Sequence, residues 1–105
     1  FLGRGATLVK YTGSRGKGGS NDANSEFISY IRRVFNENNV IWQMGELGKV
    51  DQGGGGTIAY ILANYGMDVV DCGVPVLSMH APYEAVSKAD VYMTYKGYKA
   101  FYTSK

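Results

Sequence analysis

Hydrophobic and polar positions follow one another in short blocks, and their period switches between that of a strand and that of a helix. Alternation and β-branching over residues 6–11 predict a strand, and the apolar run 40–44 predicts a second. Between them, Asn21 or Asp22 is expected to cap a helix that runs to about Asn38. The apolar positions of this helix recur at helical spacing: Phe27, Ile28, Ile31, Val34 and Phe35.

The second half of the chain repeats this change of period. Thr57 is expected to open a short helix through Asn64, and Gly66 suits the left-handed position just past a helix end. The apolar segments 67–71 and 74–79 predict one or two further buried strands.

A final helix is expected from about Pro82, because proline is tolerated in the first helical turn. Its predicted buried stripe consists of Val86, Ala89, Met93, Lys96 and Ala100. A broad aromatic surface is made of Tyr92, Tyr95, Tyr98, Phe101 and Tyr102. Gly97 costs about 1 kcal/mol in a helix interior relative to alanine and is expected to allow close packing.

Strands that alternate with helices at short spacing predict an α/β fold with a mostly parallel sheet flanked by helices. The 105 residues, 45% of them hydrophobic, suffice for one small core, and no internal boundary is expected within residues 1–105. Because the chain begins at Phe1 without an initiator methionine, it is expected to be a fragment of a longer protein. The single Cys72 favours a reducing compartment, most simply the cytoplasm. No apolar stretch approaches the about 20 residues of a membrane span.

Charge and glycine content suggest an anion site. Arg4, Lys10, Arg15 and Lys17 precede the first acidic residue, Asp22, although the net charge of +2 does not itself indicate nucleic acid. Two glycine-rich loops, 13–20 and 53–56, stand before predicted helices, where free backbone N–H groups attract negative charge. Neither loop has the lysine of a nucleotide-binding P-loop or the dinucleotide fingerprint. Both loops are equally compatible with plain flexible connections, and the basic stretch with a solvated loop.

His80, the only histidine, closes the apolar run that starts at Gly73. A side chain at the end of a strand in an α/β protein faces the ligand crevice, and imidazole binds divalent metals or moves protons. One histidine does not make a metal site, so His80 is either structural or shares a metal with ligands outside this chain. The carboxylates near the predicted sheet edges are Glu46, Asp51, Asp68, Asp71 and Glu84, of which Glu84 is expected to orient the His80 loop or to cap the last helix.

Three stretches carry a resemblance to a known family: 10–17 leading to Ser25–Phe27, then Gly48–Thr57, then Gly73–Glu84 with its Leu-Ser-Met-His ending at position 80. Their order is similar to the C-terminal catalytic segment of the aspartyl aminopeptidase (vacuolar aminopeptidase I) family of zinc exopeptidases, and closest to its bacterial members. The resemblance implies a phosphorylase/hydrolase-like catalytic domain.

The resemblance also implies the chemistry. Two divalent metal ions, expected to be zinc, share a bridging aspartate and a water that attacks the N-terminal peptide bond. His80 matches the last metal ligand, whereas the other ligands and the general-base glutamate lie upstream in the family, so the isolated chain is expected to be inactive. Lys10 matches a position that receives an acidic substrate side chain, and Gly55, Gly56 and Thr57 match the loop that shapes the substrate pocket. Peptides are the implied substrates, and the implied partners are the upstream polypeptide and further subunits of a dodecamer.

Two other functions stay open from the sequence. A non-catalytic α/β module would bind an anionic or phosphorylated ligand through the glycine loops and the basic stretch, with Arg15 or Lys17 essential. A purely structural fragment would complete a sheet and bind no ligand.

Overall fold

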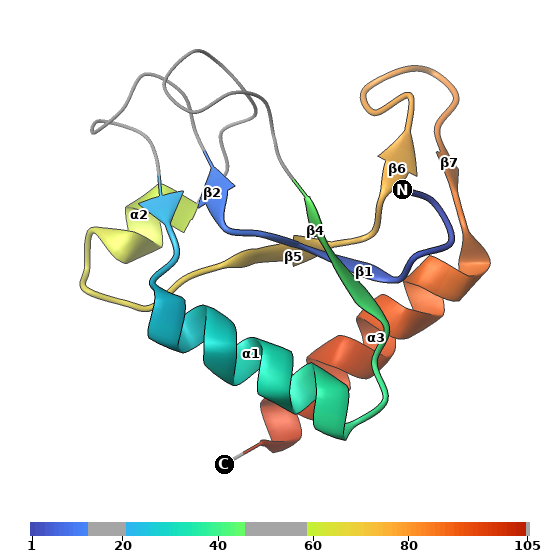
Figure 1. Cartoon of the computed structure of the whole chain (residues 1–105). Helices are drawn as coiled ribbons and strands as arrows, with labels where there is room; N and C mark the ends of the chain where they lie inside the picture. The colour runs from blue at the N-terminus through green and yellow to red at the C-terminus, as the bar shows by residue number, and fades with distance from the viewer. Residues whose placement is uncertain (13–20, 46–58, 105) are drawn as a thin grey trace. The chain divides into compact units, whose positions relative to one another are not determined.

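The computed structural model describes residues 1–12, 21–45 and 59–104 (Figure 1). Its elements, in chain order, are β1 (Ala6–Val9), β2 (Tyr11–Thr12), β3 (Asn21–Asp22), α1 (Ser25–Glu37), β4 (Trp42–Gly45), α2 (Ala59–Ala63), β5 (Asp71–Gly73), β6 (Val76–Leu77), β7 (Ala85–Val86) and α3 (Lys88–Thr103). At least one strand precedes each helix, but three strands follow one another at the start of the chain and again before α3.

The strands form one three-stranded sheet in the order β4-β1-β5 and two two-stranded sheets, β2-β3 and β6-β7. Both two-stranded sheets are antiparallel, with Tyr11 opposite Asp22 and Val76 opposite Val86. Short hairpins of this kind were not predicted, because two-residue strands carry no readable alternation. A mostly parallel arrangement stays a prediction for the three-stranded sheet.

The chain divides into two units, and each is described by itself. Unit 1 comprises Phe1–Thr7, Ile31–Gln43 and Cys72–Lys105, and unit 2 comprises Leu8–Tyr30 and Met44–Asp71. The absence of an internal boundary over residues 1–105 stays a prediction. The buried apolar residues of unit 1 are Ala6, Ile31, Val34, Phe35, Val40 and Ala100, and those of unit 2 are Leu8, Val9, Ala23 and Ile28.

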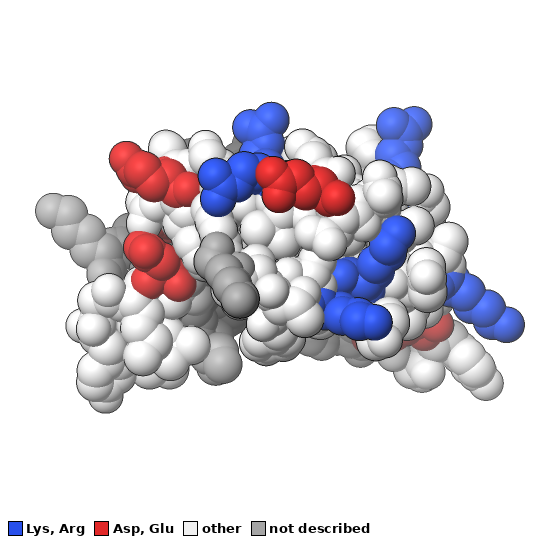
Figure 2. Space-filling view, turned by 90° about the horizontal axis from the view of Figure 1, so that it is seen from below, with Lys and Arg blue, Asp and Glu red and all other residues white. Residues whose placement is uncertain are grey.

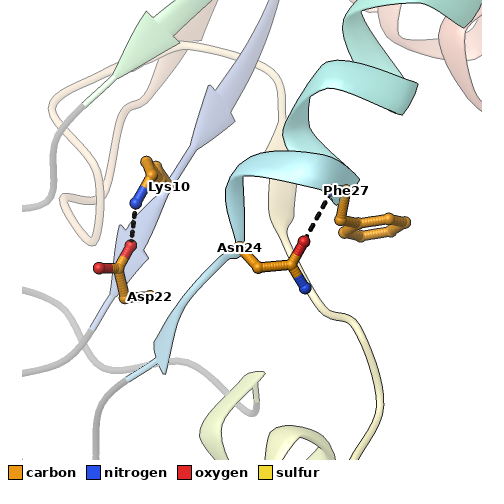
Figure 3. Close-up of polar contacts among 4 residues, drawn as sticks. All are labelled: Lys10, Asp22, Asn24 and Phe27. Carbon is orange, nitrogen blue, oxygen red and sulfur yellow. Dashed lines mark hydrogen bonds and ion pairs between the residues drawn. The ribbon is translucent and has the colours of Figure 1, made fainter.

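The start of α1 differs from the prediction. Asn24, not Asn21 or Asp22, caps the helix, because its side-chain oxygen accepts the Phe27 backbone N–H at 2.7 Å (Figure 3). The two residues expected to be caps instead form β3. Since Asn and Asp are both good cap residues, the sequence alone did not decide which of them the helix would use.

The end of α1 at Glu37 agrees with the prediction of a helix that runs to about Asn38. Asn39 takes a left-handed φ of 58°, and the Val40 N–H donates to the Phe35 carbonyl at 2.9 Å. This is the Schellman pattern, in which asparagine tolerates the left-handed position. The predicted apolar face is also confirmed, since Ile28, Ile31, Val34 and Phe35 are buried, with Phe27 half-buried.

The last helix begins at Lys88 and not near Pro82, because β7 and its hairpin occupy the residues between. Its buried residues are Asp90, Thr94, Gly97 and Ala100, so the predicted stripe of Val86, Ala89, Met93, Lys96 and Ala100 is wrong except at its last member. This buried face consists of polar and small residues, so a search for apolar periodicity does not find it. Gly97 does allow close packing, because a Cβ there would lie 3.1 Å from Phe35 Cζ. The aromatic surface is confirmed, with Tyr92, Tyr95, Tyr98 and Tyr102 exposed and Phe101 half-buried.

Asp90 is buried because it holds the start of the chain. Its two carboxylate oxygens accept the backbone N–H groups of Gly3 at 2.7 Å and Gly5 at 2.8 Å. Ionised oxygens that accept backbone N–H groups form strong hydrogen bonds, and this compensates for removing the carboxylate from water. The Ala6 N–H then donates to the Ile41 carbonyl at 3.0 Å.

Between α1 and α3 the elements are shorter than predicted. The helix expected over 57–64 is α2, Ala59–Ala63, while Thr57 lies outside the described residues. Gly66 takes the predicted left-handed φ, 81°. The segments 67–71 and 74–79 contribute only one residue to β5 and two to β6, because the chain pairs around Gly73 instead of breaking there.

Candidate functional site

His80 lies in the loop of a β-hairpin in unit 1 and not at the end of a long buried strand. The strands are β6 and β7, and the loop comprises residues 78–84 (Figure 1). All residues of the loop are exposed. The hairpin therefore presents the imidazole on the surface of unit 1, where a group outside the described residues can reach it.

A tight turn fixes the backbone of His80. The Ser78 carbonyl accepts the Ala81 N–H at 3.0 Å, and the φ angles of Ser78 and His80 are 59° and 70°. In such a four-residue turn, a positive φ at the third position is normally supplied by glycine or asparagine. A histidine in a left-handed conformation is uncommon and costs about 1 kcal/mol or more. Left-handed residues of this kind cluster at functional sites.

Glu84 supports the same turn. Its Oε1 accepts the backbone N–H of His80 at 2.5 Å. Of the two roles predicted for Glu84, orientation of the loop is confirmed, and capping of the last helix is wrong because Ser87 holds the N-cap position of α3.

A metal ion such as zinc requires about four ligands held close together. Within residues 1–12, 21–45 and 59–104, no group of three or more histidine, cysteine, aspartate or glutamate side chains is placed to hold a metal. An exposed imidazole fits a metal such as zinc as one ligand of four. Among the described residues, His80 is thus an exposed donor that belongs to no such group.

Lys10 lies in unit 2, between β1 and β2, and forms an ion pair with Asp22 (Figure 3). The two side chains are 43% and 60% exposed, so the pair is open to solvent. The Ala23 N–H donates to the Lys10 carbonyl at 2.7 Å, which holds the two segments together. Sequence reasoning missed this pairing, because it depends on the register of the β2-β3 hairpin.

Some of the remaining residues that the sequence singled out for a site are described by the structure, and others are not. Gly55, Gly56 and Thr57 lie outside the described residues, as do Arg15, Lys17, Glu46 and Asp51. The Asp68 carboxylate accepts a hydrogen bond from the Asn24 amide, which makes it part of the support for the α1 cap. Cys72 is half-buried, and its carbonyl accepts a hydrogen bond from the Tyr98 hydroxyl.

The face of the molecule drawn in Figure 2 carries both basic and acidic side chains among the described residues, so the charge on this face is mixed. No helix in the described part of the chain is long and apolar enough to span a bilayer.

The sequence matches a known family over nearly its whole length. The profile described as Aminopeptidase I zinc metalloprotease (M18) covers residues 1–102. A relative in Clostridium acetobutylicum, named probable M18 family aminopeptidase 1, is 64% identical over 101 residues, which are 96% of this chain and 22% of that relative. A relative of the same name in Thermotoga maritima is 57% identical over 99 residues, 94% of this chain and 22% of its own length.

Solved structures agree. The crystal structure of aminopeptidase I from Clostridium acetobutylicum superposes with a TM-score of 0.89 at 62% identity, over 99% of this chain and 23% of that one. The Thermotoga maritima M18 aminopeptidase gives 0.86 at 56% identity, over 94% and 22%. The chain thus spans 22% of the length of the curated relatives it matches. The family match, the identities and the shared fold establish that this chain belongs to the M18 family of aminopeptidase I zinc metalloproteases.

Proposed function

We propose that this chain is the C-terminal portion of the catalytic domain of a zinc-dependent aminopeptidase, to which it supplies the metal ligand His80. The observation that carries the proposal is the exposed imidazole on the β6-β7 hairpin of a chain that matches the M18 family over residues 1–102. The absence of a three-ligand group in the described residues supports a site shared with the rest of the protein.

The proposed chemistry is removal of N-terminal residues from peptides. Two bound divalent metal ions would polarise the scissile carbonyl and lower the pKa of the attacking water. His80 would contribute a neutral imidazole nitrogen, the usual histidine donor for zinc, from an exposed position in the turn of residues 78–81. The general-base glutamate and the remaining ligands would come from the preceding polypeptide, so the isolated chain would not turn over substrate.

Hydrolysis assays on the complete protein test the activity. We expect release of the N-terminal residue from peptides with a free amine, loss of this activity after dialysis against a chelator, and its return on addition of zinc. The matched control is the same peptide with an acetylated N-terminus, which should not be cleaved. Cleavage that continues in chelator, or that proceeds equally on the acetylated peptide, would contradict a metal-dependent aminopeptidase.

Lys10 is the proposed basis of a preference for acidic N-terminal residues. Its side chain is 43% exposed, and its ammonium already pairs with Asp22, a carboxylate like that of an aspartyl or glutamyl substrate residue. A substrate carboxylate would replace Asp22 as the partner of Lys10. Gly55, Gly56 and Thr57 are proposed to line the same substrate pocket.

Two variants separate recognition by Lys10 from a structural role. Lys10→Met should lower kcat/KM for aspartyl or glutamyl substrates by about tenfold, the loss of one charge-assisted hydrogen bond, and leave leucyl substrates unchanged. Asp22→Asn, the matched control, removes the competing carboxylate and should maintain or raise the acidic preference. An equal loss on all substrates in Lys10→Met would show that Lys10 only stabilises the hairpin.

Three further properties belong to the same proposal. The protein would work in the cytoplasm, as its single cysteine suggests. It would act on peptides and bind neither nucleic acid nor membrane. It would assemble into a homo-oligomer, a dodecamer by resemblance, in which the exposed tyrosines of α3 could contact other parts of the protein.

A further inference from the structure

The side chain of Glu84 forms a hydrogen bond with the backbone of His80. Glu84 directly precedes β7, whose residues Ala85 and Val86 pair with Leu77 and Val76 of β6. The hairpin ladder therefore fixes the backbone from which the Glu84 side chain extends. From this position its Oε1 reaches back across the loop to the His80 N–H at 2.5 Å.

This hydrogen bond has a specific task, because the conformation of His80 is unfavourable. A residue with φ of 70° relaxes toward negative φ unless its surroundings hold it. The turn bond from Ala81 to Ser78 constrains the neighbours of His80, whereas Glu84 binds the amide of His80 itself. A charged acceptor makes this bond stronger than one between neutral groups.

We propose that Glu84 is a positioning residue for the metal ligand His80: its carboxylate holds the His80 amide, and thereby keeps the imidazole in the orientation in which it binds metal. The inference rests on the proposed function of His80 and assigns a role to a residue that does not itself bind metal. Loss of Glu84 would leave the ligand present but mobile, so metal would bind more weakly instead of not at all.

The test compares glutamate variants in the complete protein by their metal affinity, measured as metal content after equilibration with a graded series of chelator concentrations. Glu84→Ala should weaken binding by about tenfold, at the lower end of the effect of residues that orient metal ligands. Glu84→Gln keeps an oxygen acceptor at the same reach and should weaken binding by less than about threefold. Glu84→Asp keeps the charge but shortens the side chain by about 1.5 Å, and should resemble Glu84→Ala.

Two controls keep the outcomes distinct. Glu37→Ala removes an exposed carboxylate at the end of α1 and should leave metal affinity unchanged. His80→Ala should lose metal outright; if it retains metal and activity, the proposed function fails. If His80→Ala loses metal while Glu84→Ala binds it as tightly as the unmodified protein, the positioning role alone is wrong.

A kinetic readout separates positioning from a general loss of structure. At saturating zinc the activity of Glu84→Ala should recover, with KM for the peptide unchanged, because only the metal-free loop is affected. If Glu84→Ala does not fold by circular dichroism, Glu84→Gln decides. Metal binding by Glu84→Gln as weak as that by His80→Ala would overturn the proposal, since its acceptor oxygen is still present.

Discussion

Replacement of His80 by glycine in the complete protein is expected to lower kcat/KM for N-terminal hydrolysis by about a thousandfold or more. The loss of one metal ligand removes several kcal/mol of transition-state stabilisation, and about 4 kcal/mol corresponds to this factor. The fold should not suffer. Glycine has no Cβ to oppose a φ of 70°, and the relief of about 1–2 kcal/mol exceeds the cost of about 0.4–1 kcal/mol that comes from the greater freedom of glycine in the unfolded chain.

His80→Ala is the matched control for this effect. It removes the same imidazole but keeps a Cβ at the left-handed position, so it should lose as much activity and be less stable than His80→Gly by about 1 kcal/mol. Steady-state kinetics measure the activity, metal analysis measures the metal content, and urea unfolding in the presence of chelator measures the stability. A glycine variant that keeps its full metal content would contradict the ligand role of His80. A glycine variant less stable than the alanine variant would contradict the left-handed backbone.

Gly5→Ala should produce the largest loss of stability, about 3–5 kcal/mol, because two separate costs add. Gly5 has a φ of 94°, and a Cβ at this position would lie 2.0 Å from the Ile41 carbonyl oxygen, far inside contact distance. That oxygen cannot move away easily, since it accepts the Ala6 N–H at 3.0 Å. Chemical denaturation of the complete protein, with aminopeptidase activity as a second probe, measures the effect.

Gly3→Ala provides the comparison two residues earlier. Gly3 also has a positive φ, 82°, but a Cβ there would meet nothing within 4 Å. Its cost should be limited to the backbone, about 1 kcal/mol. Equal stabilities of the two alanine variants would show that the close approach of Gly5 to Ile41 does not exist in solution.

The sequence predicted those features that depend on local chemistry. The apolar face of α1 was readable because its buried residues recur at helical spacing. The asparagine-rich end of α1 and the left-handed Gly66 were readable because few residues tolerate these conformations. His80 was readable as a candidate because it is the only histidine, although its role as a ligand came from resemblance.

Features that depend on distant partners could not be read. Asp90 resembles any acidic residue in a first helical turn until Gly3 and Gly5, far away in sequence, donate to it. The buried face of α3 was assigned one position off, because Asp90, Thr94 and Gly97 have no apolar signature. The strand expected to deliver His80 proved to be a short hairpin, whose turn depends on Glu84 and not on a hydrophobic pattern.

The hydrogen bonds from Gly3 and Gly5 to Asp90 also determine when the start of this chain can fold during synthesis. Gly3 and Gly5 precede their acceptor by 87 and 85 residues. A ribosome that adds about 5–20 residues per second needs roughly 4–17 s to reach Asp90 after making Gly5. Throughout that interval Gly3 and Gly5 lack the Asp90 carboxylate, and their final hydrogen bonds form only when Asp90 has been synthesised.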